Sequence, residues 1–256
     1  MKTIAIIGGT GLTEFSELSN VKCHAQESKV LDLGLGCPSS AITEAVFNGT
    51  RLLFLSRHGH PRALPPHKIN YRANLLALQA LGADEIIAVN AAGGISTHAV
   101  AGHLVIPDQL IDYTHGRENT FFDGAFRPLD HVEFSYPYDE GLRQRIYTAL
   151  KQLALPLGFS RSGVYGVTQG PRLETIAEIR RLEQDGCDVV GMTGMPEAVL
   201  ARELEIPYAS VCLVVNPAAG KTSQEIALEE IHAVLIQGMV EIKQLIFQIC
   251  GINSSE

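Results

Sequence analysis

The chain has 256 residues, of which 46% are hydrophobic and 19% charged, so it can bury one large core. Its formal net charge of -8, without a cluster of Lys and Arg, argues against a nucleic-acid backbone or an anionic membrane as partner. No apolar run approaches the roughly 20 residues of a membrane span, and no cleavage site follows the apolar start, which predicts a cytoplasmic protein.

Short β-rich apolar runs alternate with helical patterns along the chain. Strands are expected at 3–7, 45–47, 51–56, 85–90, 102–107, 164–168, 189–192 and 208–215. Helices are expected at 71–81, 140–153, 175–184, 196–204 and 223–249. This alternation predicts an α/β fold: one domain over residues 1–256 with a central mixed, largely parallel β-sheet flanked by helices.

Two segments have distinctive patterns. In the last helix, Thr222 stands three residues before Glu225 in capping-box spacing, and apolar positions recur at helical intervals until just before Gly251. The segment from Tyr113 to Tyr138 lacks periodicity but holds seven of the chain's 16 aromatic residues, 7 Tyr and 9 Phe in total. Long segments of this kind are usually functional or interfacial.

The cysteines and histidines predict neither a disulfide framework nor a metal site. There are 5 cysteines, an odd number without CxxC spacing, which is typical of reduced thiols. His58, His60 and His67 lie in a Pro-rich segment without an accompanying acid or an HExxH frame, so we expect no metal.

Polar residues stand where five expected strands end, and such ends lie together at one edge of an α/β sheet. We therefore expect one crevice formed by Gly8 to Gly11, Ser56 to His58, Asn90 with Ala91, Met192 with Thr193, and Asn216.

The glycine turn from Gly8 to Gly11 and the run from Ser56 to His58 suit the binding of an anion. Glycine N–H groups can surround it, Thr10 adds a hydroxyl, the Arg57 fork can grip two oxygens, and His58 can donate. A structural turn and a dinucleotide-binding turn remain alternatives for Gly8 to Gly11, although Glu14 replaces the last glycine of the dinucleotide pattern and only Asp32 stands near the place of a ribose-binding acid. Arg57 and His58 also fit a solvated strand end. No GxSxG elbow for a hydrolase occurs.

Together the motifs GGTGL, SRHG, HKINYRAN, NAAGG, TQGPRLET and VVGMTGMPEAVLARE, in this order, resemble the trimeric purine nucleoside phosphorylase and methylthioadenosine phosphorylase family over nearly the whole chain. The resemblance implies the nucleoside phosphorylase fold and attack of phosphate on C1′ of a nucleoside. It implies no cofactor beyond phosphate as co-substrate, small-molecule partners only, and a homotrimer.

The resemblance also implies residue roles. It places phosphate at Thr10, Arg57, His58, Asn90, Ala91 and Thr193, ribose over Met192, and the base near Leu173, Glu174, Asn216, Pro217 and Ala218. Asn216, His58 and Arg57 are the catalytic candidates, because an amide near N7 and groups holding the phosphate stabilise the separating charges.

Base preference follows from hydrogen-bonding capacity. Methylthioadenosine phosphorylases typically carry a small hydroxyl residue in place of Glu174 and aspartates in place of Asn216 and Ala218. Glu174 can accept from N1–H of a 6-oxopurine while Asn216 donates to O6 and accepts at N7, whereas adenine presents a lone pair at N1. The alternatives are purely structural roles: an acid at a helix N-terminus for Glu174 and a turn residue for Asn216.

The sugar end indicates a 5′-methylthio group. Leu228 stands where the family's 6-oxopurine enzymes commonly place a histidine, and it can share a helix face with Ile231, although plain core packing explains such a face equally well. His131 resembles the residue that reaches the site from a neighbouring subunit. The residues together predict a phosphorylase for a 6-oxopurine nucleoside with a 5′-methylthio group. The alternatives are an inosine or guanosine phosphorylase, a methylthioadenosine phosphorylase, and a dinucleotide-dependent oxidoreductase or a nucleoside-binding module.

Overall fold

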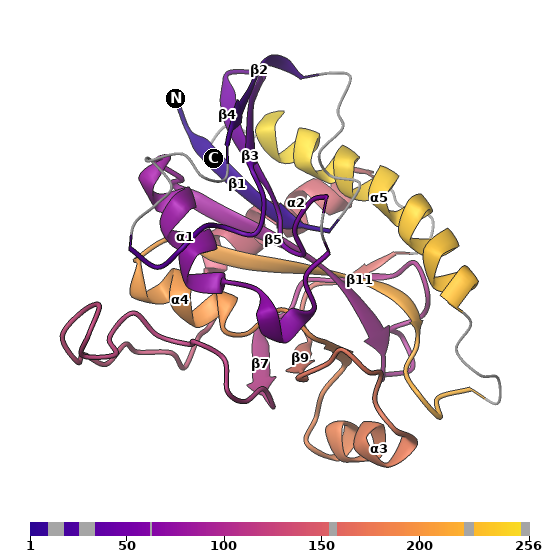
Figure 1. The fold of residues 1–256 in the computed structure, drawn as a ribbon. Helices are drawn as coiled ribbons and strands as arrows, with labels where there is room; N and C mark the ends of the chain where they lie inside the picture. The colour runs from indigo at the N-terminus through magenta and orange to yellow at the C-terminus, as the bar shows by residue number, and fades with distance from the viewer. Residues whose placement is uncertain (10–17, 26–33, 62, 154–157, 223–227, 252–256) are drawn as a thin grey trace.

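The computed structural model describes residues 1–9, 18–25, 34–61, 63–153, 158–222 and 228–251 as an α/β fold with helices on both faces of one sheet (Figure 1). The strands are β1 (Thr3–Gly8), β2 (Ser19–His24), β3 (Ile42–Phe47), β4 (Thr50–Ser56), β5 (Glu85–Gly94), β6 (Leu104–Val105), β7 (Gln109–Asp112), β8 (Phe159–Ser160), β9 (Val164–Val167), β10 (Val189–Gly191) and β11 (Tyr208–Pro217). The helices are η1 (Pro66–Lys68), α1 (Tyr71–Ala80), α2 (Glu140–Leu153), α3 (Ile176–Gln184), α4 (Glu197–Glu203) and α5 (Leu228–Gly251).

Strand β5 organises the sheet, whose described strands run β2-β3-β4-β1-β5-β10-β9-β7, with β11 pairing β5 and leading on to β6 and β8. The first half of β5 pairs parallel with β1, and its second half pairs antiparallel with β10. β11 runs parallel to β5 along nearly its full length. The ends of β1, β10 and β11 therefore meet around the second half of one strand.

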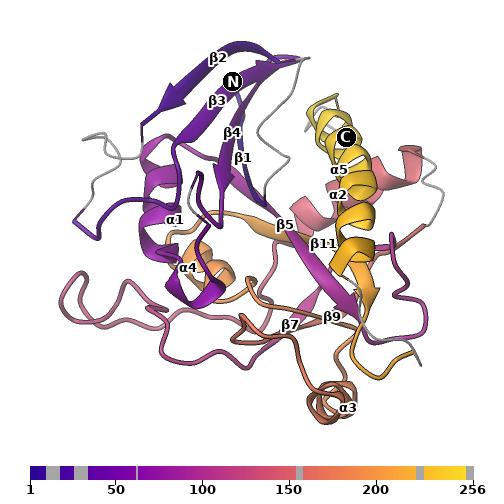
Figure 2. The same cartoon turned by 45° about the vertical axis from the view of Figure 1, so that its right-hand side comes forward.

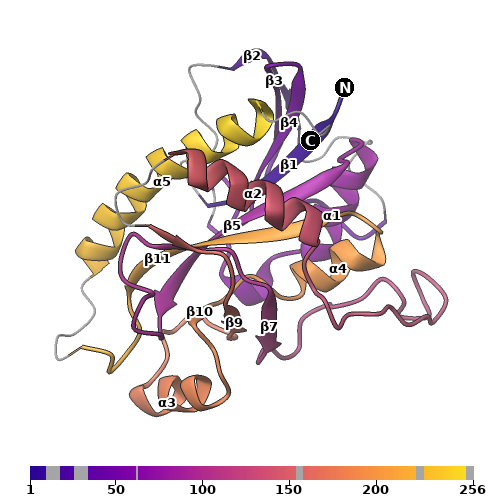
Figure 3. The ribbon, with the colours of Figure 1, turned by 180° about the vertical axis from the view of Figure 1, so that it is seen from behind.

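Helices α1, α4, α2 and α5 form two layers. Figure 2 shows α1 and α4 on one side of the sheet and α2 and α5 on the other, and Figure 3 shows α2 and α5 from behind. Each layer encloses an apolar core. The first includes Leu75 and Leu200, and the second includes Ile146 and Ile246; these residues are buried because the helices that carry them place one apolar stripe against the sheet.

Helix α5 is apolar over a longer stretch than expected, since no run long enough to span a membrane was predicted from the sequence. Its span Glu229–Gly251 is long and apolar enough, by length and composition, to cross a membrane. The same helix packs on β11 and α2 and buries Ile242, Leu245, Ile246 and Ile249, as the core helix of a globular domain does. The expected capping box of Thr222 and Glu225 lies partly outside the described residues, and the helix includes Gly251 rather than stopping before it.

The other expected elements are present, with altered ends. Strand β5 extends to Gly94, beyond the expected Asn90, because β10 and β11 continue to pair with it. The strand expected at 102–107 is reduced to the two residues of β6. Strands β2, β7 and β8 were not expected, since their short sequences show too little apolar alternation.

Candidate active site

The expected convergence of strand ends is observed in the structure. The Arg57 backbone N–H after β4 donates to Gly8 O of β1 at 2.9 Å. Asn216 of β11 pairs with Gly93 of β5, which in turn pairs with Val190 of β10. Since neighbouring strands are about 4.8 Å apart, the polar residues that end these strands share one edge of the sheet.

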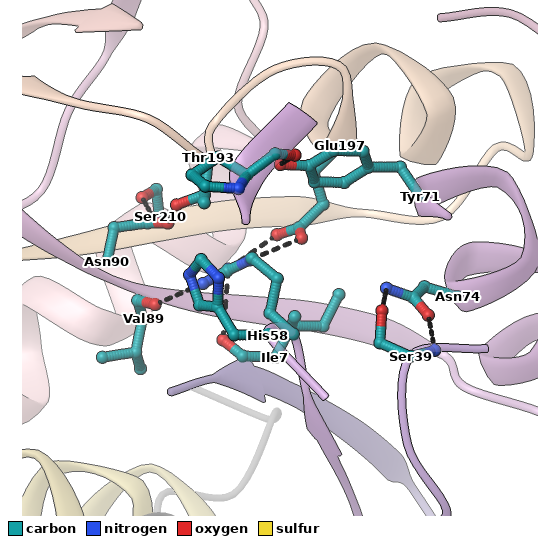
Figure 4. Close-up of polar contacts among 12 residues, drawn as sticks. Ile7, Ser39, His58, Tyr71, Asn74, Val89, Asn90, Thr193, Glu197 and Ser210 are labelled. Carbon is teal, nitrogen blue, oxygen red and sulfur yellow. Dashed lines mark hydrogen bonds and ion pairs between the residues drawn. The ribbon is translucent and has the colours of Figure 1, made fainter. Parts of the chain in front are cut away.

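Arg57 lies beneath this edge rather than on it. Its side chain is 2% exposed, and that of Glu197, at the start of α4, is 0% exposed. The guanidinium donates from Nε and Nη2 to the Glu197 carboxylate at 2.7 and 2.8 Å. It also donates to the carbonyls of Val89 and Ile7 (Figure 4). Burial alone would lower the pKa of Arg57, but the charge of Glu197 and its hydrogen bonds outweigh burial and raise it.

The described contacts give Arg57 a structural role. Its Nε and Nη2 bind the Glu197 carboxylate, and one N–H of Nη1 donates to Val89 O, so Arg57 holds the start of α4 against β5 and β1. The alternative of a solvated strand end is wrong, since the side chain is buried. A contact of Arg57 with phosphate stays a prediction.

His58 directly follows Arg57 in the chain, and its side chain is half-buried. Burial lowers the pKa of His58 from its usual 6.5, which favours the neutral ring at pH 7. Its Nδ1 is 3.0 Å from Leu64 O, so Nδ1 carries the proton and Nε2 presents a lone pair. His58 as described is thus an acceptor at Nε2, where we expected a donor.

Asn90, in the middle of β5, and Thr193, just after β10, form a buried polar chain. The Thr193 hydroxyl donates to Asn90 Oδ1 at 2.8 Å, and Asn90 Nδ2 donates to Ser210 Oγ at 2.7 Å (Figure 4). The Asn90 amide therefore orients Thr193 from below. Ala91, the next residue along β5, is exposed at the edge itself.

Glu174 lies on the irregular segment between β9 and α3 and lines a cavity of about 450 Å³. Its Oε1 accepts a hydrogen bond from the Thr168 hydroxyl at 2.5 Å. Leu173 is 45% exposed beside it. Among the described residues that line this cavity, Glu174 is the only one in the expected substrate-binding set.

Asn216 ends β11 at a register shift between Val214 and Asn216. Its Nδ2 donates to Pro217 O at 2.7 Å, which leaves the second N–H and Oδ1 for other groups. Ala218 is buried and its N–H donates to Gly94 O at 2.8 Å. The strand end that carries Asn216 is thus fixed to β5.

Met192 follows β10 and packs against Gly170, whose φ is +60°. A Cβ on Gly170 would lie 2.4 Å from Met192 Sδ, so only glycine permits both this backbone conformation and this contact. The side chain expected beneath the ribose is therefore placed by the TQGPRLET motif.

Arg117 is a residue that the sequence reasoning missed. Arg117 lies in the aromatic segment, Tyr113 to Tyr138. Its guanidinium donates to the carbonyls of Met192 at 2.9 Å, Met195 at 2.6 Å, Thr168 at 3.2 Å and Gln169 at 2.9 Å. Burial lowers the pKa of Arg117 below its usual value. The only sequence signal was its place in a long segment without periodicity.

The expected 5′ and glycine-turn residues are only partly described. Ile231, on α5, is half-buried and packs on the second apolar core, which agrees with the alternative of plain core packing. The side chain of Leu228 and all of Thr10, Glu14 and Asp32 lie outside the described residues. His131 is exposed on the aromatic segment.

Within the described residues no group of three or more His, Cys, Asp or Glu is placed to hold a metal ion. All five cysteines are free thiols, with Cys187 and Cys212 buried, Cys250 half-buried, and Cys23 and Cys37 exposed.

Comparison with known proteins identifies the class of this chain as a phosphorylase. Residues 3–250 match the model of the phosphorylase superfamily, and the chain belongs to that family. A probable S-methyl-5′-thioinosine phosphorylase of Pseudomonas syringae pv. tomato is 52% identical over 243 residues, 95% of this chain and 96% of the relative. A 6-oxopurine nucleoside phosphorylase of Pyrococcus furiosus is 40% identical over 251 residues, 96% and 91% of the two chains.

Solved structures show the same fold. A methylthioadenosine phosphorylase from an antarctic soil metagenomic library superposes with a TM-score of 0.90 at 34% identity, covering 99% of this chain and 86% of that one. Methylthioadenosine phosphorylase from Schistosoma mansoni in complex with adenine gives 0.90 at 27% identity, with 100% and 93% covered.

Proposed function

We propose that this protein catalyses the reversible phosphorolysis of S-methyl-5′-thioinosine. A phosphate oxygen bonds to C1′ as the C1′–N9 bond breaks, and the base leaves with the electron pair and takes up a proton. The products are hypoxanthine and 5-methylthioribose 1-phosphate. No cofactor enters this balance.

The observation that carries the proposal is the Glu174 carboxylate at the base end. It only accepts hydrogen bonds while ionised, and Thr168 already donates to one of its oxygens. A 6-oxopurine brings N1–H to such a group, whereas adenine brings a lone pair. A mismatched buried pair costs about 1 to 3 kcal/mol, enough for strong discrimination. Asn216, at the end of β11, has the free N–H and Oδ1 that O6 and N7–H require.

At the phosphate end the described side chains favour a protonated phosphate. Nε2 of His58 accepts, and the Thr193 hydroxyl is committed to Asn90. A P–OH group can donate to His58, and the remaining oxygens can take N–H groups at the ends of β1 and β5. Arg57 contributes here by holding these strand ends.

The 5′ end and the assembly extend the proposal. Leu228 and Ile231 would contact the methylthio group, and a homotrimer in the cytoplasm would bring His131 of one chain to the site of the next. The exposure of His131, Leu129 and Tyr136 on the aromatic segment supports this, because that segment is accessible to a second copy. A 6-oxopurine nucleoside phosphorylase acting on inosine or guanosine is the second candidate, favoured by the Pyrococcus furiosus relative.

Specificity constants in phosphate for methylthioinosine, methylthioadenosine, inosine and guanosine test the proposal. We expect methylthioinosine to have the highest kcat/KM and base release to require phosphate. A higher value for methylthioadenosine would contradict the role of Glu174 and Asn216, and a higher value for inosine would contradict the apolar 5′ contact.

A further inference from the structure

Thr168, which directly follows β9, connects the base end of the site to β10. Its backbone N–H donates to Gly191 O at 2.8 Å. Its hydroxyl lies 2.5 Å from Glu174 Oε1 and 3.3 Å from the same Gly191 carbonyl. Both Thr168 and Glu174 line the cavity of about 450 Å³. One side chain thus links the carboxylate to the residue just before Met192.

The Thr168 hydroxyl donates its hydrogen bond to the Glu174 carboxylate rather than to the Gly191 carbonyl. A hydroxyl has one proton to donate, and an O–H to carboxylate bond is typically 2.5 to 2.7 Å long, about the distance observed here. The contact of 3.3 Å with Gly191 O is the weaker of the two. Oε1 of Glu174 is therefore occupied, and Oε2 is the oxygen left for a ligand.

Glu174 needs such support because its own backbone gives little. It lies in the irregular stretch between β9 and α3, one residue before the cap Thr175, and its side chain is half-buried. A carboxylate on such a stretch can adopt several rotamers, and a site group must be held within about 0.5 Å of its working position. The Thr168 hydroxyl fixes the rotamer of Glu174.

We propose that Thr168 is a positioning residue for base selection: by donating to Oε1 of Glu174 it directs Oε2 at N1 of the purine and so favours a 6-oxopurine over adenine. The inference rests on the proposed function, in which Glu174 contacts N1. Without the Thr168 hydroxyl, the Glu174 carboxylate can turn away from N1, so the preference between bases narrows.

The experiment removes the hydroxyl at constant shape. T168V and, as a second hydroxyl-free variant, T168A are compared with T168S, which keeps the hydroxyl. For each, kcat/KM is measured for methylthioinosine and methylthioadenosine at saturating phosphate, together with KM for phosphate. The affinities of free hypoxanthine and free adenine are measured by calorimetry, which needs no turnover.

We expect T168V and T168A to reduce the preference for the 6-oxopurine at least about tenfold, the scale of a lost charge-assisted hydrogen bond. The change should appear in the nucleoside KM and in hypoxanthine affinity, while KM for phosphate stays within about twofold and T168S keeps the preference. In an E174Q background the T168V substitution should not change the base preference further, because the carboxylate that Thr168 contacts is absent.

T120V is a matched control. The Thr120 hydroxyl donates to Glu203 Oε1 at 2.7 Å, the same pairing of Thr with Glu at a place that does not line the cavity. It should leave the base preference unchanged.

The proposal is overturned if T168V and T168A keep the wild-type ratio of hypoxanthine to adenine affinity, if T168S loses it, or if T168V acts equally in the E174Q background. A wild-type enzyme that prefers methylthioadenosine would instead refute the proposed function. The affinity ratios of the free bases still decide the role of Thr168 in that case.

Discussion

The buried pair of Arg57 and Glu197 fixes the start of α4 beneath the site. The chain separates the two residues by 140 positions, yet both lie under the site with almost no exposure. Tyr208 also donates to Glu197 Oε1 at 2.9 Å. Removing one member of such a pair leaves a buried charge without its partner.

E197Q keeps the shape of the side chain but removes its charge, so the guanidinium of Arg57 stays buried and uncompensated. We expect a loss of about 3 to 5 kcal/mol in the free energy of unfolding, measured by urea denaturation. E183Q is the control, since Glu183 is 52% exposed in its ion pair with Lys221, and it should cost less than about 1 kcal/mol. Equal losses in the two variants would show that the buried pair contributes no more than a surface one.

At the scale of elements, Arg117 joins the aromatic segment to the two loops that carry Thr168 and Met192. R117Q removes a planar cation whose N–H groups reach four backbone carbonyls. We expect the nucleoside KM to rise at least about tenfold, because hydrogen bonds from a charged donor contribute about 1.5 to 3 kcal/mol each. R117K should reverse only part of this rise in the nucleoside KM, since an ammonium lacks the planar fork of a guanidinium.

R127Q provides the matched control in the same segment. The Arg127 guanidinium lies 5.5 Å from the centre of the Phe121 ring and 5.9 Å from that of Phe126. Steady-state kinetics of R127Q should resemble the wild type. If R117Q also keeps the wild-type nucleoside KM, the segment does not set the geometry of the loops.

The sequence predicted elements better than their contacts. α2 begins and ends where the pattern placed it, because local periodicity decides a surface helix. Thr193 and Asn216 were also placed correctly at or just beyond strand ends, since polar residues after apolar runs are a local signal. Asn90 lies inside β5, because β10 and β11 continue to pair with that strand up to Gly94. The capture of Arg57 by Glu197, the antiparallel run of β10 and the contacts of Arg117 depend on tertiary packing, which no local pattern encodes.

At the scale of the whole molecule, the exposed aromatic segment leads to a prediction about assembly. We expect hydrodynamic mass to correspond to three chains, and H131A and N216A each to lose most activity alone. Mixing the two variants after partial dissociation should restore activity, because one chain then supplies Asn216 and its neighbour supplies His131. Full activity of H131A alone, or no recovery on mixing, would contradict a shared site.

The pairing of β5 with β1, β10 and β11 also affects how heat inactivates the protein. The backbone amides of such a central strand exchange with solvent only when the molecule opens globally. Because the polar residues of the site lie on or next to these same strands, activity and the folded fraction of the assembled protein should decline together on warming. Substitutions at the periphery would then change how much enzyme a cell retains, while each surviving molecule works at its normal rate.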